Sequence, residues 1–230
     1  MSIILIIAEA ALELVPESIA WHSAVVKHAK SKGKDVKSIL LDRSYHHTAM
    51  LNLKDAEKRG RPDIVHFTLL EATSIPLYFK DILDVYIHTI DDKVIRVGKS
   101  VRLPKNYNRF VGLIEDLYAK KVIVNNEGDT LLSLHESKLS SLIDKIKPSK
   151  VIGLSRHGIS KDAEYVAEQV ISKNKACIVI GGFAKGTFSQ STLGLFDQLV
   201  SISSYSLEAH VVAARVLYEV EKILCKRTLK

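Results

Sequence analysis

The stretch ACIVIGGFAKG, residues 176–186, decides the fold prediction, because an apolar run ends there in a glycine-rich turn. A short, continuously apolar segment is typical of a strand buried on both faces of a parallel sheet. Two similar junctions are GLS at 153–155, which follows KVI, and ISSYSL at 202–207. Ligands of α/β sheets bind beyond the carboxyl ends of strands, where glycines let the bare backbone approach them. The three loops therefore predict one ligand site.

The glycine loop does not match the common phosphate-binding motifs. Gly181 and Gly186 have the spacing of a P-loop, but Thr187-Phe188 follows them where that motif has Lys-Ser/Thr. The dinucleotide fingerprint G-x-G-x-x-G is missing as well. Tight turns that bind nothing would use the same glycines, so the loops alone leave a purely structural role open.

Outward from this stretch, strands and helices alternate along the chain. In the N-terminal half we predict strands at 2–10, 37–42 and 63–73, a helix at 16–33 that Gly33 ends, and a short helix from Pro76. Two strands at 84–91 and 93–98 form a hairpin that turns at Asp91-Asp92. This hairpin suggests a β-rich insertion at about 84–105.

The alternation continues to the C-terminus. We predict helices at 108–121, 137–146, 161–173 and 206–224, and strands at 129–134, 150–155 and 176–182. The fold class is therefore α/β with a mainly parallel sheet, in one domain over residues 1–230. The final helix is apolar over most of its surface, which suits a core helix or one shared with a subunit interface.

The chain is basic, with 33 lysines and arginines against 26 acidic residues and a pI near 9.2. This excess favours a polyanionic partner without establishing one. Residues 96–109 hold five cations and no acidic residue, and Tyr107 and Phe110 lie among or beside them. Cations can grip phosphates while aromatic rings stack on bases, but a solvated basic loop with Phe110 in the core would look the same. Arg61 and Asp63 are either a second RNA-contacting group or an ordinary ion pair.

Several other functions are not supported. Cys177 and Cys225 are too far apart for a CxxC motif, which suits a reducing cytoplasm. The N-terminal apolar run is interrupted early by glutamates, so neither a signal peptide nor a membrane span is expected. His46 and His47 lack a third ligand at a suitable spacing, so we predict no metal site. His66 and His88 are expected to be packed and hydrogen-bonded.

The combined motifs resemble one family. IGGFAKG at 180–186 and ISSYSLEAHVVAARVLYE at 202–219 are similar to the C-terminal motifs of the small-subunit ribosomal RNA pseudouridine N1-methyltransferases, of the prokaryotic or archaeal type. Other matching segments are LLDRSYHH, KRGRPDIVHF, YIHTID and RLPKNYNRFVGLIEDL, in the family's order. The resemblance implies the SPOUT class, with a C-terminal trefoil knot that binds S-adenosylmethionine in a bent conformation.

The resemblance also implies roles for individual residues. The cofactor contacts, largely through the backbone, would be Leu154, Gly181, Gly186, Ile202, Ser203, Ser204, Tyr205, Ser206 and Leu207. The RNA contacts would be Arg61, Arg102, Lys105 and Arg109, with Asp63 orienting Arg61. The family usually has proline at Ser206, often histidine at Lys185, and arginine at Lys105; a lysine can still meet a phosphate but loses bidentate geometry.

The implied reaction is methylation of N1 of a pseudouridine in small-subunit ribosomal RNA by a cytoplasmic homodimer. Ribosomal proteins or assembly factors are compatible further partners. No carboxylate is uniquely placed to accept the N1 proton, so no catalytic residue is assigned. Two alternatives stay open: an RNA-binding assembly factor without catalysis, and a SPOUT enzyme that modifies another base or atom.

Overall fold

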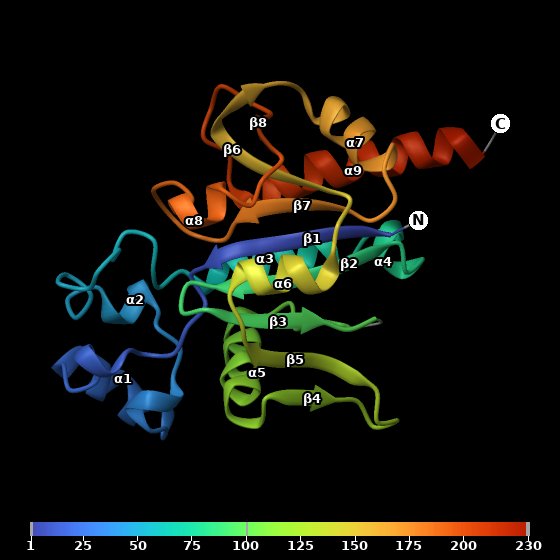
Figure 1. Ribbon diagram of the computed structural model, residues 1–230. Helices are drawn as coiled ribbons and strands as arrows, with labels where there is room; N and C mark the ends of the chain where they lie inside the picture. The colour runs from blue at the N-terminus through green and yellow to red at the C-terminus, as the bar shows by residue number, and fades with distance from the viewer. Residues whose placement is uncertain (1, 100, 229–230) are drawn as a thin grey trace.

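The computed structural model describes residues 2–99 and 101–228 (Figure 1). Its described strands form one sheet in the order β4-β5-β3-β2-β1-β7-β6-β8. The neighbours β2, β1, β7, β6 and β8 run parallel, whereas β3, β5 and β4 extend the sheet in antiparallel fashion. The bounds are β1 Ile3–Ala10, β2 Leu83–Thr89, β3 Lys93–Val97, β4 Val122–Val124, β5 Thr130–Glu136, β6 Lys150–Ser160, β7 Ala176–Gly181 and β8 Gln198–Ser201.

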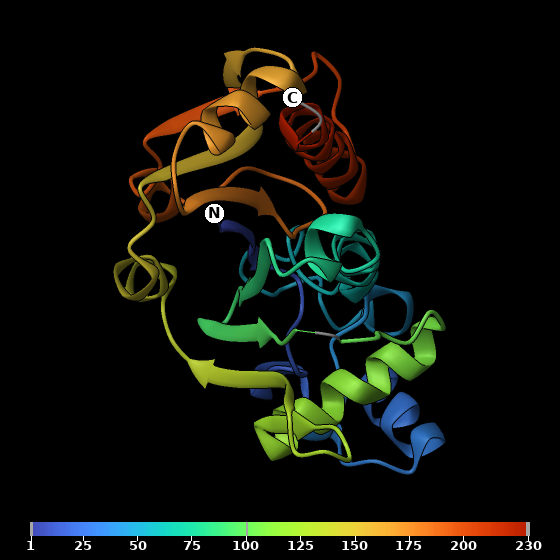
Figure 2. The same cartoon turned by 90° about the vertical axis from the view of Figure 1, so that its right-hand side faces the viewer.

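Helices cover both faces of this sheet. Figure 2 shows α3, α5 and α9 on one side of the sheet and α6 on the other. The bounds are α1 Ser23–Lys32, α2 Arg43–His46, α3 Pro62–Ala72, α4 Pro76–Phe79, α5 Tyr107–Lys120, α6 Leu139–Ile146, α7 Ala163–Ile171, α8 Gln190–Leu193 and α9 Ala209–Thr228, with 3-10 turns at Glu17–Ile19 and Val36–Ser38. The larger apolar core lies under α3, α5, α7 and α9, and a smaller one lies under α6.

β1 is the central strand, and every residue of it is buried. It pairs in parallel with β2 on one side and β7 on the other. Its neighbours cover both edges and helices cover both faces, so an uninterrupted apolar run is what this position requires. The α/β fold class predicted from such runs is confirmed.

Two predicted strands are wrong. Residues 63–73 form most of α3: Ile64, Val65, Thr68, Leu69 and Ala72 are buried at helical spacing, and Pro62 opens the helix. Residues 37–42 form no sheet strand: Ile39 and Leu41 pack in a separate small cluster with α1, and Leu40 packs in the larger core. Leu40 makes only an isolated bridge, to Leu14.

The helix predicted at 16–33 is shorter than expected. A 3-10 turn occupies Glu17–Ile19, and α1 begins only at Ser23, where the His22 ring accepts a hydrogen bond from the Ala24 amide. The predicted end at Gly33 is confirmed, since Gly33 adopts the left-handed conformation with φ 62°.

The hairpin predicted at 84–98 is confirmed, with Val85–His88 paired to Val94–Val97 and Asp92 in the turn at φ 57°. Its first strand, β2, is also the parallel neighbour of β1, so the hairpin continues the main sheet. The antiparallel part extends through β5 and β4, which lie beyond 84–105. The division into one domain with an insertion stays a prediction.

Two chain segments approach each other closely near the C-terminal strands. A Cβ atom added to Gly158 would lie 2.5 Å from the backbone of Val200, so only glycine allows this approach. The Lys161 amide donates to the Ser201 carbonyl at 2.9 Å beside the same point. The trefoil threading implied by the resemblance stays a prediction. In the described residues, no helix has the length and apolar character needed to span a membrane.

Candidate cofactor pocket and RNA interface

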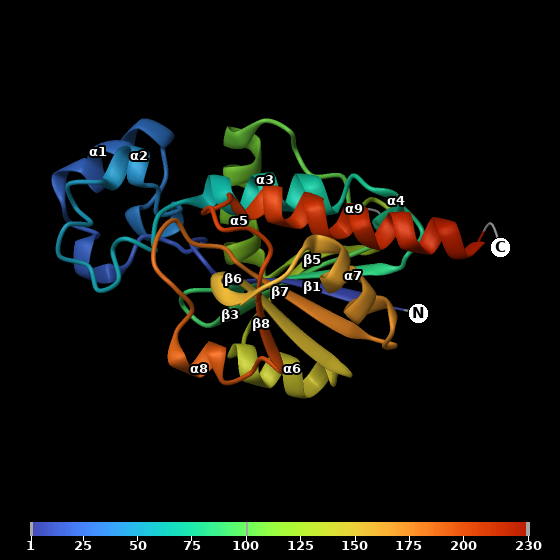
Figure 3. The ribbon, with the colours of Figure 1, turned by 90° about the horizontal axis from the view of Figure 1, so that it is seen from above.

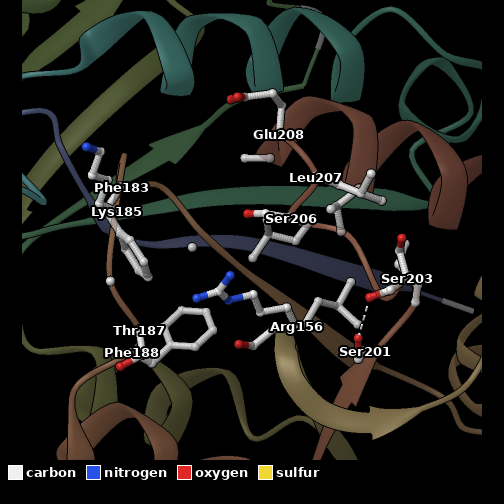
Figure 4. Close-up of a pocket in the computed structure, with 18 of the residues that line it drawn as sticks. Arg156, Phe183, Lys185, Thr187, Phe188, Ser201, Ser203, Ser206, Leu207 and Glu208 are labelled. Atoms are coloured by element: carbon white, nitrogen blue, oxygen red, sulfur yellow. Dashed lines mark hydrogen bonds between the residues drawn. The ribbon is translucent and has the colours of Figure 1, made fainter.

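A cavity of about 420 Å³ opens at the carboxyl ends of β7 and β8, beside residues 154–156 of β6 (Figure 4). The strand register explains its position, because Leu154 of β6 lies level with Ile180 of β7 and Val200 of β8, and all three line the cavity. β7 and β8 end near this level, at Gly181 and Ser201, whereas β6 continues past it to Ser160. Ser155 and Arg156 of β6 therefore line the cavity together with the loops that follow β7 and β8. This is the arrangement expected at the edge of a parallel sheet.

Most of the predicted cofactor residues line this cavity. They are Leu154, Gly181, Gly186, Ile202, Ser203, Tyr205, Ser206 and Leu207. Ser204 belongs to the same loop but is exposed and is not part of the lining. The structure thus brings the three loops together, while their contacts with a cofactor stay a prediction.

The segment 182–189, which we call the cofactor loop, is fixed at both ends. At its start, the Gly182 amide donates to Ala8 and its carbonyl accepts from Ala11, both at 2.8 Å. A side chain at Gly182 would collide with Ile7 and Ala10 of β1. At its end, the Phe188 ring is buried edge-to-face against Phe183 and Phe196. Between these anchors, Gly186 has φ 97°, a conformation that favours glycine.

The loop at 202–208 is held mainly by its own serines. The Ser201 hydroxyl donates to the Ser203 carbonyl at 2.8 Å (Figure 4), and the Ser203 hydroxyl accepts from the Tyr205 amide at 3.1 Å. Leu207 and the first turns of α9 supply apolar lining through Ala209 and Val212. Together the loops offer backbone polar groups and apolar walls, which suit a nucleoside.

Three charged residues of the lining were missed by the sequence prediction. Figure 4 shows the Arg156 side chain extending from β6 into the cavity, and Lys185 and Glu208 also line it. The sequence signal for Arg156 was its position directly after the predicted GLS junction at 153–155. Glu208 is the acidic member of the described lining, and it also acts electrostatically on Arg61.

Arg61 lies next to this cavity and is held by Asp63. Arg61 donates from Nε and Nη2 to the two carboxylate oxygens of Asp63, at 2.8 and 2.7 Å. This paired bond is the largest cause of the raised pKa of Arg61. Ile64, in the first turn of the same helix, lines the cavity. The predicted orienting contact between Asp63 and Arg61 is thus present in the structure.

The other predicted RNA contacts, Arg102, Lys105 and Arg109, are exposed where the chain enters α5. A hydrogen bond of 2.7 Å between His66 Nε2 and the Pro104 carbonyl ties this segment to α3. We call Arg61, Arg102, Lys105 and Arg109 the basic face. His66 is therefore packed and hydrogen-bonded, as the sequence predicts.

The aromatic side chains of this segment, Tyr107 and Phe110, make contacts within the protein. Phe110 is fully buried, and the ring of His66 stacks on it with a centroid distance of 4.3 Å. The Tyr107 hydroxyl donates to Asp42 at 2.5 Å. Burial, followed by this bond, raises the pKa of Tyr107 far above its ordinary value. Phe110 thus lies in the core, as expected both for an RNA-contacting segment and for a solvated basic loop, and its burial does not decide between these two.

The described residues contain no group of three or more histidine, cysteine or acidic side chains that could hold a metal ion. His46 is fully buried, with Nε2 2.9 Å from His28 Nδ1 and Nδ1 accepting from the Asp42 amide at 3.1 Å. Burial, followed by the neighbouring His28, lowers its pKa to about 4. His46 therefore acts as a neutral hydrogen-bonding residue at neutral pH.

Fold and cavity together define an α/β protein with a nucleoside-sized site at the carboxyl edge of its parallel strands. The model of the EMG1/NEP1 methyltransferase family matches residues 5–221. The chain is 44% identical over 191 residues to the ribosomal RNA small subunit methyltransferase Nep1 of Pyrococcus furiosus, covering 83% of this chain and 85% of that protein. It is 40% identical over 219 residues to the Nep1 of Staphylothermus marinus, covering 95% of each.

A solved structure is similar over nearly the whole chain. The crystal structure of Archaeoglobus fulgidus Nep1 bound to S-adenosylhomocysteine superposes with a TM-score of 0.87 at 35% identity, covering 98% of this chain and 100% of that one. The chain belongs to the EMG1/NEP1 methyltransferase family. The family resemblance found in the sequence motifs is thereby confirmed.

Proposed function

We propose that this protein transfers a methyl group from S-adenosylmethionine to N1 of a pseudouridine in small-subunit ribosomal RNA. The cavity at the carboxyl ends of β7 and β8 carries this proposal, because eight of the nine residues expected to contact the cofactor line it. The printed names of the relatives and the S-adenosylhomocysteine bound to the similar structure support the same activity.

The cavity suits this cofactor in size and in lining. At about 420 Å³ it falls in the range of small-molecule sites. Leu154, Ile180 and Leu207 would supply apolar contacts to the cofactor, and backbone groups of the 202–207 loop would supply hydrogen bonds to it. When bound, the cofactor supplies a methyl group activated by its sulfonium. The protein's task is then to bring the acceptor base into line with it.

The basic face would hold the RNA beside this cavity. Its four cations can neutralise phosphates around a nucleotide that leaves its stack. A positive environment lowers the cost of removing the N1 proton and stabilises the anionic base.

The test is methyl transfer from labelled cofactor to two synthetic hairpins that differ only in pseudouridine or uridine at one loop position. The proposal predicts transfer to the pseudouridine hairpin and little to the uridine one. Equal transfer to both would favour a SPOUT enzyme acting on another atom. Tight hairpin binding with transfer to neither, although S-adenosylhomocysteine binds, would favour an assembly factor without catalysis.

We further propose that the protein is a homodimer formed through the helical layer of α3, α4 and α9. These helices lie along one face in Figure 3, and α9 packs against α3 and α4. Phe67, Phe79 and Tyr218 on them are 50%, 69% and 62% exposed, so this layer offers large apolar side chains that a second copy could cover. Sedimentation equilibrium at micromolar concentrations should give twice the chain mass; a monomer throughout would contradict this proposal. The cytoplasmic location and further protein partners stay predictions.

A further inference from the structure

Two largely buried ion pairs join Glu9 of β1 and Glu13, just after β1, to the segment before α3. Glu9 pairs with Lys58, with 2.7 Å between Oε2 and Nζ, and Glu13 pairs with Arg59, with 2.7 Å between Oε1 and Nε. The side chains of Glu9 and Lys58 are only 9% and 14% exposed. Burying a charge pair is costly unless both ions are well bonded, so such pairs are weak evidence for stability alone. Folding stability alone therefore does not account for the buried Glu9–Lys58 pair, and its contacts with the cofactor loop suggest a functional role.

The backbone at Glu9 is unusual for a strand. Glu9 has φ 48°, a left-handed conformation that strains a non-glycine residue, and the pairing of β1 with β2 shifts register between Ile7 and Ala10. The result is that the Glu9 carboxylate meets the cofactor loop: its Oε1 accepts from the Ser189 amide at 2.8 Å. Burial alone would raise the pKa of Glu9, but bonds from Lys58 and Ser189 outweigh it, and the pKa is lowered. Glu9 is thus an anion that binds the end of this loop.

Lys58 contacts the same loop further along. Its ammonium lies 4.7 Å from the centroid of the Phe183 ring. Its Cε lies 3.4 Å from the position that a Cβ on Gly186 would occupy, so its aliphatic stem covers the loop at its most unusual residue. Phe183 and Gly186 both line the cofactor cavity. One side chain therefore bridges Glu9 to two points of the cavity wall.

We propose that Lys58 and Glu9 are positioning residues: they hold residues 183–189 of the cofactor loop in the conformation that binds the cofactor. This inference rests on the proposed function of the cavity. Glu9 fixes the loop's end through Ser189, and Lys58 fixes its middle against Phe183 and Gly186. Neither residue touches the cofactor in this account; each acts through the loop.

The neighbouring ion pair supplies a matched control. Arg59 follows Lys58 directly, and its partner Glu13 is 2% exposed in its side chain. In the described part of the chain, the hydrogen bonds of Arg59 go to Glu13 and to the Lys54 carbonyl, and none reaches the cofactor loop. Arg59→Met therefore breaks a buried pair in the same segment without removing a contact to the cavity wall.

The experiment measures S-adenosylhomocysteine binding to the full chain by calorimetry, with melting temperatures taken alongside. Lys58→Met should weaken binding by about tenfold, which lies within the range of interaction energies between residues in contact. Lys58→Arg, which keeps the charge and the ring contact, should recover most of it. Arg59→Met should lower the melting temperature and leave binding within about threefold of the wild type. At saturating RNA, Lys58→Met should raise KM for the cofactor more than it lowers kcat.

A second variant keeps the inference testable if Lys58→Met fails to fold. The double variant Glu9→Gln with Lys58→Met removes both charges, and the amide oxygen of Gln can still accept from Ser189; it should show the same loss of binding. Wild-type affinity in either variant, or an equal loss in Arg59→Met, would overturn the inference. If the wild-type protein itself bound no S-adenosylhomocysteine, the proposed function would fail instead.

Discussion

Asp63→Asn tests the orientation of Arg61 with almost no change in shape. In the wild type, two parallel bonds fix the guanidinium plane of Arg61. An asparagine has only one oxygen to offer and carries no charge, so the fixed plane is lost while Arg61 stays protonated. We therefore expect the arginine to remain near its position but to sample several orientations.

The cost in folding stability should be small. The two side chains are 39% and 29% exposed, so solvent screens much of their attraction, and such pairs contribute at most about 1 kcal/mol. Asp63 also lies in the first turn of α3, where a negative charge adds a few tenths of a kcal/mol. We expect the free energy of unfolding to fall by about 1 kcal/mol in urea titrations.

The cost in RNA affinity should be larger. Binding must then immobilise a guanidinium that Asp63 no longer orients, and we expect about tenfold weaker hairpin binding, or ~1.4 kcal/mol. Fluorescence anisotropy with a labelled hairpin at fixed salt measures this, and calorimetry with S-adenosylhomocysteine should show unchanged cofactor affinity. Unchanged RNA affinity, or a loss of stability above about 3 kcal/mol, would refute this account of the pair.

Three further predictions concern the close approach of Gly158 to Val200, the stability at acid pH and the basic face. Gly158→Ala places a methyl group 2.5 Å from the Val200 backbone, so unfolding should become easier by about 3 kcal/mol or more; an unchanged melting temperature would show that the two segments can separate freely. The pKa of His46 is about 4 in the folded state and ~6.5 in the unfolded state. Its contribution to the free energy of unfolding is therefore fully present above pH ~6.5 and is lost as the pH falls towards 4. It amounts to at most about 3 kcal/mol, and His46→Asn should flatten the dependence of unfolding free energy on pH in that window; identical slopes would contradict the assignment. Arg102→Ala and Arg109→Ala should each lower the salt slope of RNA binding by about one, whereas a constant slope would place them away from phosphates.

In the C-terminal half, the longer helices and the strands at 129–134, 150–155 and 176–182 were predicted because their apolar patterns are clear, whereas the short elements β4, α8 and β8 were not predicted. The run ACIVI and the helix of α9 have unambiguous apolar spacing, and both are found where expected. Residues 63–73 were misassigned because most of α3 is apolar, so its helical period resembles a continuous buried strand. Residues 37–42 were misassigned for another reason: Ile39 and Leu41 are buried in a local cluster with α1 and Leu40 in the larger core, and no pattern in the segment distinguishes this from the burial of a strand.

The candidate site was predicted in part for similar reasons. Loops such as 202–207 could be recognised by their motifs, and they meet at the cavity because Leu154, Ile180 and Val200 lie in register on neighbouring strands. The pairing of Lys58 with Glu9 could not be predicted, since 49 positions separate them and only the folded chain brings them together. The tight approach at Gly158 likewise depends on where β8 lies in the sheet.

The position of the transferred methyl group tests the central claim most directly. A hairpin with a single pseudouridine would be incubated with the protein and S-adenosylmethionine, digested to nucleosides, and analysed by chromatography and mass spectrometry against N1- and N3-methylated standards. The account predicts N1-methylpseudouridine as the product, with none formed when the cofactor is omitted. A methyl group on N3, on a ribose or on a neighbouring base would contradict it.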